Sequence, residues 1–527
     1  MNLNVHIWKG KKSNLIFTFL ILPILLCAQI NIEKYTDSLF NNKGEIYFSF
    51  KINSKKEINK ISKIVSIDHN TNDTIAYAYA NKSEYTSFLK MNIQHKIIEK
   101  KIIIYDQKNK NNWNYYPSYN EYVTIMQDFA TNFPDICKLH SLGTLNSGRE
   151  ILIVQISDNV GVKENEPSFL YTSSMHGDEL TGYVLMLRLI DYLLNNYGNN
   201  TRLTTLINEI DIWINPLANP DGAYAGGNQN IWAATRYNAS YVDLNRNFPD
   251  PEDGNHPDGF PWQEETVMFM GLSDTIKFDL SSNLHTGTEL ANYPWDTWGN
   301  LTADDNWWRF ICQEYADSCQ TNGSSGYFDS QNNGITNGYD WYEVNGGRQD
   351  YMNYFNQCRE FTLELSNYKI PDPNNLPYYW NSNFPSLINF MEQSLYGLRG
   401  IVSDSITGNP IKAKIEIVGH DLDSSHIYSK LPIGNYHRYL YQGNYNITFS
   451  KAGYYSKTIN ENILNKNTTI LNIKLVPISS TGVQSIYNNY KFKTLDILGR
   501  PKVNKENIQM KIEISKNGQV NKLIRIE

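Results

Sequence analysis

The chain has 527 residues, which at roughly 150 residues per domain corresponds to about three or four domains. Hydrophobic residues make up 41% of it and aromatic residues 13%, enough to build ordinary buried cores, which excludes global disorder. The net charge of −7 argues against a nucleic-acid binder, because such proteins carry basic surface stripes. Five cysteines are too few for a disulfide-dense scaffold or a multi-finger zinc protein.

Residues 1–28 have the pattern of a secretory signal peptide. Three lysines precede the apolar run Leu15 to Cys27, which is too short to span a bilayer, and Ala28 offers a cleavage point. A short buried N-terminal helix is the alternative. A lipoprotein anchor on Cys27 is disfavoured because Leu26 is bulky where such sites carry a small residue. No later stretch is apolar enough for a membrane span, so we expect a soluble, exported chain.

Export would leave four cysteines, at positions 137, 312, 319 and 358. Four cysteines allow three complete pairings, and the sequence does not choose between them. The same residues are equally compatible with free buried thiols.

Residues 29–110 predict a small α+β module, with strands over 45–52 and 96–105 and a helix over 81–91. The module contains no recognisable chemistry, and a removable prosegment is one role it could have. A polar stretch over 106–114 predicts a linker to the next domain.

Residues 111–396 predict an α/β domain with a mixed, largely parallel sheet covered by helices on both faces. The expected helices lie over 121–133 and 180–197. The expected strands lie over 149–158, 168–175, 210–217, 278–285 and 360–366.

Short strands without helices follow over 397–477 and predict a small antiparallel β-sandwich. Residues 478–527 predict a linker and a short all-β tail with strand segments over 492–501, 508–519 and 520–527. The dipeptide Asn517-Gly518 in the tail favours a hairpin turn.

Three residues near predicted strand ends have side chains that bind metal. His176 and Glu179 follow the strand over 168–175, and His285 ends the strand over 278–285. Two histidines and one glutamate form a common ligand set for catalytic zinc, with a fourth position left open for water. A His-x-x-Glu spacing alone is a weak signal, and His285 is the residue that strengthens it.

Further polar residues lie near predicted strand ends, where open α/β sheets bind their ligands. Arg236, Asn245 and Arg246 belong to one segment, and Glu364 lies inside the last expected strand. Their common position favours a single site over scattered surface residues.

Six motifs in fixed order resemble the M14 zinc carboxypeptidases: "MHGDE", "NPLANPDG", "YVDLNRNFPD", "LHTGTELANYPWD", "GYDWYEVNGGRQDY" and "FTLELS". The regulatory branch, which includes carboxypeptidases D, E, M and N, is the most similar, and the segment after residue 397 resembles the transthyretin-like domain of that branch. The tail, with "DILGR" before a hairpin, resembles the C-terminal sorting domain of the type IX secretion system.

This resemblance implies a role for each candidate residue. His176, Glu179 and His285 match the zinc ligands, so the expected cofactor is one Zn²⁺. Glu364 matches the general base. The remaining matches are Arg236 to the arginine that stabilises the oxyanion, Asn245 and Arg246 to the pair that binds the substrate's terminal carboxylate, and Tyr342 to the tyrosine that closes over the substrate.

The resemblance also implies a side-chain preference. Asp296 and Gln349 match the residues that basic-specific members use in the pocket, which predicts release of C-terminal Lys or Arg. Alternatively, Asp296 caps a surface turn. Arg348 stands where the branch often has methionine, and an additional cation could weaken that preference or face away from the pocket. "HTGTE" replaces the usual "HGG" after His285.

We therefore expect a secreted or cell-surface metallocarboxypeptidase that acts as a monomer on peptide or protein C-termini. Its tail would engage the secretion machinery, and we expect neither nucleic-acid binding nor a membrane span. One alternative is a carboxypeptidase of cell-wall peptides. Another is a catalytically silent protein that binds peptides or glycans.

Overall fold

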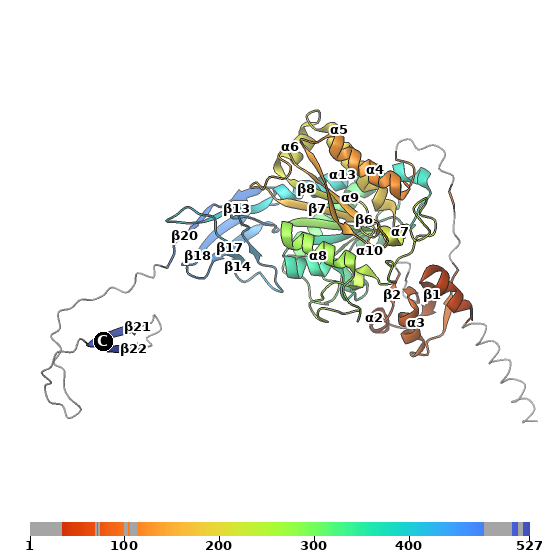
Figure 1. The fold of residues 1–527 in the computed structure, drawn as a ribbon, viewed down its shortest axis with the longest axis horizontal. Helices are drawn as coiled ribbons and strands as arrows, with labels where there is room; N and C mark the ends of the chain where they lie inside the picture. The colour runs from red at the N-terminus through yellow and green to blue at the C-terminus, as the bar shows by residue number, and fades with distance from the viewer. Residues whose placement is uncertain are drawn as a thin grey trace, which may run out of the picture.

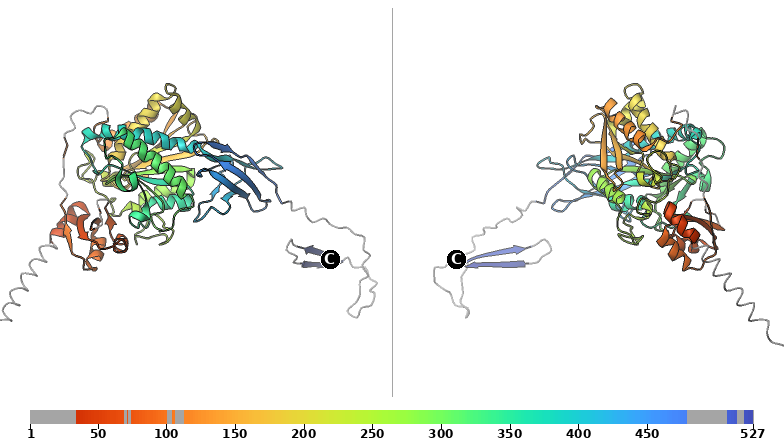
Figure 2. Two further views of the ribbon diagram at one scale, coloured as in Figure 1. Left: turned by 180° about the vertical axis from the view of Figure 1, so that it is seen from behind. Right: turned by 45° about the vertical axis from the view of Figure 1, so that its right-hand side comes forward.

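The computed structural model describes residues 34–68, 71, 74–99, 104–105, 113–478, 508–514 and 520–526. A central α/β body (residues 113–396) carries a smaller N-terminal module (residues 34–97) at one end and a β-sandwich (residues 397–478) at the other (Figures 1 and 2). The expected signal peptide lies outside the described residues.

The N-terminal module combines helices with one small sheet. A helix over 34–43 precedes a four-stranded sheet of order β2-β3-β1-β4. The capping box of Asn81 and Glu84 begins α3. Of the strand expected over 96–105, residues 96–97 belong to β4, which pairs with β1 at the sheet edge, and residues 100–103 lie outside the described residues. The bounds are β1 (Ile46–Lys51), α2 (Lys55–Ser62), β2 (Ser66–Ile67), β3 (Ile75–Ala80), α3 (Lys82–Leu89) and β4 (His95–Ile97).

The central body is built on a mixed sheet of eight strands, ordered β11-β10-β12-β9-β7-β8-β6-β5. The four central strands β12, β9, β7 and β8 run parallel and are buried along their whole length, because helices cover both faces. This confirms the predicted fold class. The bounds are β5 (Cys137–Thr144), β6 (Glu150–Ile156), β7 (Ser168–Ser173), β8 (Asp211–Asn215), β9 (Leu280–His285), β10 (Glu289–Tyr293), β11 (Ile335–Asn337) and β12 (Arg359–Leu365).

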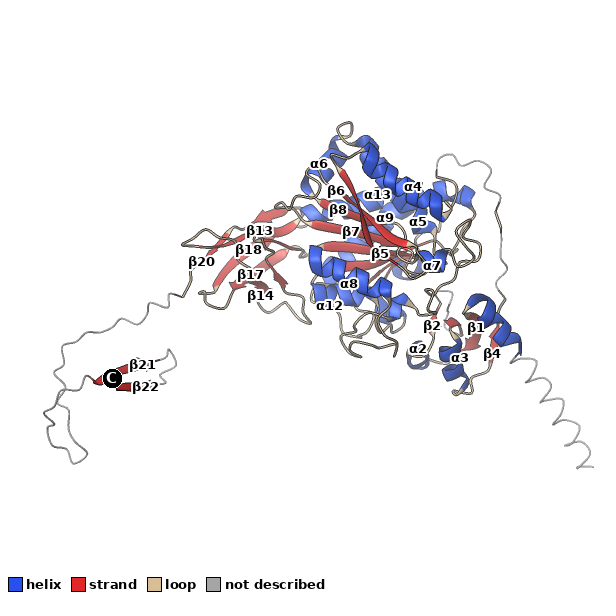
Figure 3. Cartoon of the chain, viewed as in Figure 1, coloured by secondary structure: helices blue, strands red, loops and turns tan. Residues whose placement is uncertain are grey.

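Two layers of helices cover this sheet (Figure 3). One face packs against α4 (Tyr119–Asn132), α5 (Thr181–Asn196), α6 (Thr201–Glu209), α9 (Asp305–Asn322) and α13 (Leu376–Glu392), which share the largest buried apolar cluster. The other face packs against α8 (Glu264–Ile276) and α12 (Arg348–Asn356), with a separate cluster. Short helices lie in the loops: α7 (Pro220–Ala223), η1 (Leu244–Arg246), α10 (Ser330–Gly334), α11 (Gly338–Trp341), η2 (Pro373–Asn375) and η3 (Gln393–Leu395).

The β-sandwich has two sheets, β16-β13-β19 with β20, and β15-β14-β17-β18. Most strand pairs in it are antiparallel, as the sequence predicts, whereas β13 pairs in parallel with β19 and β20. The chain crosses to the second sheet for β17 and β18 before β19 and β20 return to the side of β13. These two strands then run in the same direction as β13. The bounds are β13 (Gly397–Asp404), β14 (Lys414–Ile417), β15 (Ile427–Tyr428), β16 (Asn435–Arg438), β17 (Gly443–Ser450), β18 (Lys457–Ile463), β19 (Thr468–Ile470) and β20 (Ile473–Leu475).

In the tail, β21 (Ile508–Ile514) and β22 (Val520–Ile526) pair as an antiparallel hairpin, whereas the strand expected over 492–501 lies outside the described residues. The four cysteines in the described residues are buried free thiols, which agrees with one of the two alternatives left open by the sequence. Among the described helices, none combines the length and apolar character that a membrane span requires.

Candidate active site

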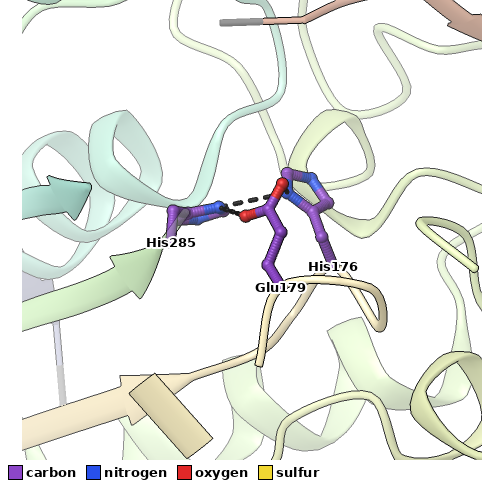
Figure 4. A group of neighbouring side chains, drawn as sticks. All are labelled: His176, Glu179 and His285. Carbon is purple, nitrogen blue, oxygen red and sulfur yellow. Dashed lines mark hydrogen bonds and ion pairs between the residues drawn. The ribbon is translucent and has the colours of Figure 1, made fainter. Parts of the chain in front are cut away.

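Two neighbouring strands bring the metal-binding residues together. β7 and β9 are parallel neighbours, so their carboxyl ends meet at one edge of the sheet. His176 and Glu179 lie in the loop that follows β7, and His285 is the last residue of β9. All three side chains are buried and converge on one point (Figure 4).

The distances within this cluster fit a zinc ion. Nδ1 of His176 lies 3.1 Å from Nδ1 of His285, and the two oxygens of Glu179 lie 3.1 and 2.8 Å from these nitrogens. Two nitrogens that bind a tetrahedral zinc at about 2.0–2.1 Å are about 3.3 Å apart, close to the observed separation. The three residues therefore fit the donor set and spacing of a zinc site.

The outer nitrogens of both imidazoles have polar neighbours, which fix the orientation of the rings. Nε2 of His176 lies 3.0 Å from Oδ1 of Asp243, and Nε2 of His285 lies 2.9 Å from the side-chain amide of Asn283. Such partners aim the opposite nitrogen at a metal. Burial lowers the pKa of His285 to about 4, so its imidazole is neutral at pH 7, the form that binds metal.

Glu179 and Glu364 differ in their ionisation. Burial opposes the charge on Glu179, but Lys369 and His176 outweigh it and hold the pKa of Glu179 well below its usual range. Burial raises the pKa of Glu364 well above its usual range, and the charge of Glu179 adds to this effect. Two neighbouring carboxyl groups with opposite pKa shifts suit different roles in one site.

Arg236 is held rigidly beside the cluster. Its Nε and Nη2 each lie 2.9 Å from Oδ2 of Asp243, and its Nη1 lies 3.2 Å from Nδ1 of His176. The side chain is buried, and the nearby carboxylates of Asp243 and Glu179 raise its pKa further despite the opposing effect of burial. A permanently charged donor is therefore held against the metal-binding cluster.

Arg246 has buried hydrogen-bond donors without a partner among the described residues. Its Nη1 donates to the carbonyl of Asn245, whereas Nε and Nη2 have no hydrogen-bond partner among the described residues. Buried polar groups are normally hydrogen-bonded, so two unpaired donors on a cation indicate a site for an anion.

Asp296 is buried rather than exposed on a surface turn. Its Oδ1 accepts hydrogen bonds from Asn292 and from Gln349 at 3.0 and 3.1 Å, and burial raises its pKa to about 6. Arg348 faces away from it, because its guanidinium bonds Thr172 and the buried carboxylate of Glu360.

One small cavity of about 20 Å³ joins most of these groups. Eight of the ten candidate residues line this cavity: His176, Arg236, Asn245, Arg246, His285, Asp296, Tyr342 and Glu364. The other two contact lining residues: Glu179 contacts both histidines, and Gln349 contacts Asp296. A larger cavity of about 800 Å³ lies between the central body and the β-sandwich and contains none of them.

The structure adds three charged residues that the sequence analysis did not select. Asp243 bridges His176 and Arg236, Lys369 lies 2.9 Å from Oε1 of Glu179, and Asp350 accepts hydrogen bonds from the backbone of Asp296. Asp243 stands two residues before Asn245 in the quoted motif "YVDLNRNFPD", a signal that could have identified it. Asp350 likewise follows Gln349 in the quoted motif "GYDWYEVNGGRQDY", whereas the position of Lys369 carries no comparable signal.

Comparisons with known proteins agree with this geometry. The family model described as "Zinc carboxypeptidase" matches residues 122–386. Carboxypeptidase M of Mus musculus is 35% identical over 356 residues, which cover 63% of this chain and 76% of that protein. The chain belongs to the zinc carboxypeptidase family. Zinc is the metal that this family uses.

Other proteins similar to this chain are also carboxypeptidases. The catalytic chain of carboxypeptidase N from Mus musculus is 33% identical over 69% of this chain and 86% of that protein. Carboxypeptidase D of Mus musculus is 36% identical over 374 residues, which are 68% of this chain. The matched part covers only 26% of the length of that relative. Carboxypeptidase A from Helicoverpa armigera shares the fold, with a TM-score of 0.53, 18% identity and coverage of 67% of this chain and 98% of that one.

Proposed function

We propose that this chain is a secreted zinc metallocarboxypeptidase that releases single C-terminal residues from peptides or proteins, with a preference for Lys and Arg. One observation carries the proposal. A buried zinc-type cluster shares a cavity with Arg246, whose Nε and Nη2 are buried without partners. An enzyme that cuts inside a chain has no use for a buried arginine at that position, whereas a free carboxylate needs it.

His176, Glu179 and His285 would hold the zinc ion, whose Lewis acidity polarises a carbonyl and acidifies a water molecule. Glu364 accepts the proton of that water on its carboxylate and delivers it to the leaving amine. Arg236, held by Asp243, stabilises the negative charge that develops on the carbonyl oxygen.

The other cavity residues would hold the substrate. Arg246 and Asn245 bind the terminal carboxylate, and this contact places the last peptide bond at Glu364. Tyr342 closes over the bound residue and excludes water. Asp296, supported by Gln349, pairs with a cationic side chain, and the orientation of Arg348 toward Glu360 leaves that pocket free of a competing cation.

The remaining segments have supporting roles in this proposal. Residues 1–28 are a signal peptide, residues 397–477 are a transthyretin-like domain that packs against the central body, and residues 478–527 hold a type IX sorting domain. The chain acts as a monomer at the cell surface or outside the cell. The sequence patterns support these assignments, and the mass of the secreted form compared with the full chain tests the processing of both ends.

A scan of model peptides that differ only in the last residue tests the function. We expect fast release of arginine and lysine, slow release of phenylalanine, and loss of all cleavage after dialysis against a zinc chelator, with recovery on addition of zinc. Preferred release of diaminopimelate would identify a carboxypeptidase of cell-wall peptides. Peptide binding without cleavage by the zinc-loaded protein would identify a silent binding protein and contradict the proposal.

A further inference from the structure

A second group of metal-binding side chains lies at the other end of the sheet from the candidate active site. Asp158 follows β6, Glu164 lies in the loop between β6 and β7, and Glu166 stands two residues before β7. Their carboxylate oxygens all lie within 4.8 Å of one another. We call these three residues the loop cluster. His176 follows the opposite end of β7, a strand about 20 Å long, so the loop cluster is separate from the zinc-binding residues.

Glu166 is the buried member of the loop cluster, and its carboxylate lacks a partner. The residue is only 5% exposed. Among the described residues, no hydrogen bond or ion pair reaches its carboxylate, which faces the oxygens of Asp158 and Glu164. Buried carboxylates in proteins are normally paired with a cation or bound to a metal. The unpaired carboxylate of Glu166 therefore indicates a cation that the chain does not itself provide.

Lys163 lies in the same loop but does not neutralise the loop cluster. Its ammonium donates to the hydroxyl of Ser168 at 3.0 Å, and it forms no ion pair with the three carboxylates. Burial raises the pKa of Glu166 to about 8 and the neighbouring carboxylates contribute to the rise, whereas the opposing effect of Lys163 is smaller than any of these. The charges of the described residues therefore leave an excess of negative charge in the loop.

The donor atoms and their spacing favour calcium. Calcium takes oxygen ligands at 2.3–2.6 Å, so two oxygens on one ion can be up to about 4.6–5.2 Å apart, a range that includes the 4.8 Å limit of the loop cluster. Magnesium binds at about 2.0–2.1 Å and usually takes only one or two carboxylates from a protein. Zinc prefers nitrogen and sulfur ligands, which the loop cluster lacks.

A cation at this position would connect the two ends of the loop and hold it at the junction of two domains. Asp158 stands at the start of the loop and Glu166 near its end. The backbone carbonyl of Glu166 accepts a hydrogen bond from Asn435 of β16 at 3.3 Å, which joins the loop to the β-sandwich. Residues 161–163 line the large cavity between the sandwich and the central body. Order in this loop therefore bears on how the two domains meet.

We propose that Asp158, Glu164 and Glu166 form a calcium site that holds the loop between β6 and β7 against the β-sandwich. Calcium sites in extracellular modules have dissociation constants of about 10⁻⁴–10⁻³ M, and a partly exposed site with three carboxylates belongs in that range. Water completes the coordination. The site stands apart from the catalytic chemistry, so the proposal does not depend on the reaction that the chain performs.

The test titrates the zinc-loaded full chain, first freed of calcium, with calcium chloride in a calorimeter. We expect one calcium ion per chain with a dissociation constant of about 10⁻⁴–10⁻³ M. Glu166→Gln keeps the shape of the side chain and removes its charge, so we expect binding at least about tenfold weaker. Asp158→Asn should weaken binding in the same way. Both variants relieve repulsion among carboxylates, so they should fold as well as the unmodified chain without calcium.

Glu209→Gln is the matched control, because Glu209 is 53% exposed and lies outside the loop cluster. It should bind calcium as the unmodified chain does. Hydrogen exchange over residues 157–167 locates the ion independently of the heat signal. Calcium should slow exchange there in the unmodified chain and in the control, and should have no such effect in Glu166→Gln.

Three results would overturn the site. The first is absence of binding by the unmodified chain at about 10 mM calcium, ten times the weakest expected dissociation constant. The second is equal calcium binding by Glu166→Gln and the control, because the ion would then lie elsewhere. The third is tighter binding of magnesium than of calcium by the unmodified chain, which would contradict the choice of ion.

Discussion

His285 and Glu364 are register partners on the adjacent parallel strands β9 and β12, so their side chains leave the same face of the sheet side by side. One residue belongs to the metal cluster and the other is the proposed base. The spacing between them is therefore set by strand pairing deep in the core, and no flexible loop intervenes. A site built in this way holds its geometry without a substrate.

Replacing Glu364 with Gln should remove most turnover and leave zinc bound. The amide has nearly the same shape but cannot accept the proton, so we expect kcat to fall by about 10²–10⁴-fold. Metal analysis and initial rates check this. Glu209→Gln, at a side chain that is 53% exposed, is the control and should behave as the unmodified chain. A near-normal kcat in Glu364→Gln would refute the base assignment.

Replacing Arg246 with Gln should weaken recognition of the terminal carboxylate. Loss of a charged hydrogen bond costs about 1.5–3 kcal/mol, which corresponds to a decrease of about 10–100-fold in kcat/KM. The unmodified chain should strongly prefer a peptide with a free carboxylate over its C-terminal amide, and the variant should lose that preference. Arg202→Gln, at a partly exposed residue on α6, is the control. An unchanged preference would remove Arg246 from the substrate site.

Replacing Asp243 with Asn should weaken zinc binding, although Asp243 is not a ligand. Its carboxylate fixes the ring of His176 and the guanidinium of Arg236, and loss of such a partner reduces metal affinity by about 10–100-fold. Competition with a chelator of known affinity measures the effect. Asp274→Asn, at an exposed residue of α8, should leave the affinity unchanged. Equal affinities for both variants would show that Asp243 has no orienting role.

The preference for basic residues should depend on pH because the pKa of Asp296 is raised to about 6 by burial. A carboxyl group is charged above its pKa, so attraction for Lys or Arg is present above about pH 6 and is lost as the pH falls through that value. The ratio of kcat/KM for peptides ending in Arg and in Leu should therefore rise between pH 5 and pH 7. Asp296→Asn should give a low ratio that does not change with pH. A ratio independent of pH in the unmodified chain would contradict this account of the pocket.

A buried ion-pair network attaches the β-sandwich to the central body. Asp304, just before α9, accepts hydrogen bonds from Arg359 at 3.0 Å and from Arg438 of the sandwich at 2.8 Å. Despite its burial, these arginines hold the pKa of Asp304 far below its usual range. Its contribution to stability is therefore present above the pKa of the unfolded chain, about 3.9, and is lost as the pH falls below it.

Replacing Asp304 with Asn should lower the free energy of unfolding by about 3–5 kcal/mol at pH 7. The substitution removes the carboxylate that pairs with buried Arg359 and leaves buried Arg438 with Asp421 as its remaining ion-pair partner among the described residues. Denaturant unfolding at pH 7 and at pH 3 measures the difference, which should shrink at the lower pH. Asp317→Asn, on the exposed side of α9, is the control. Equal stability of the two variants at pH 7 would show that the network does not join the domains.

Local patterns predicted most of the fold of the central body, and the resemblance to the zinc carboxypeptidases supplied the roles proposed for the site residues. The buried strands β7 and β8 contain short apolar runs, whereas β9 and β12 mix apolar with polar residues. His285 ends β9, and His176 follows shortly after the end of β7. The parallel pairing of β13 with β19 and β20 was not predictable, because strand direction in a sandwich depends on how the chain crosses between sheets.

The interactions that the sequence did not reveal join segments far apart in the chain. Ser66 meets Asp243, and Tyr342 meets Ile67, across 177 and 275 residues. Neither periodicity nor spacing reports such contacts, because both describe only neighbours along the chain. For the same reason, the sequence patterns predicted strands and a helix for the N-terminal module but no position relative to the site.

The most direct test of the central claim is a crystal structure of the zinc-loaded chain with anomalous diffraction measured at the zinc absorption edge. The account predicts one strong anomalous peak within about 2.0–2.2 Å of Nδ1 of His176, Nδ1 of His285 and an oxygen of Glu179. An absent peak, or a peak only at other residues, would contradict it.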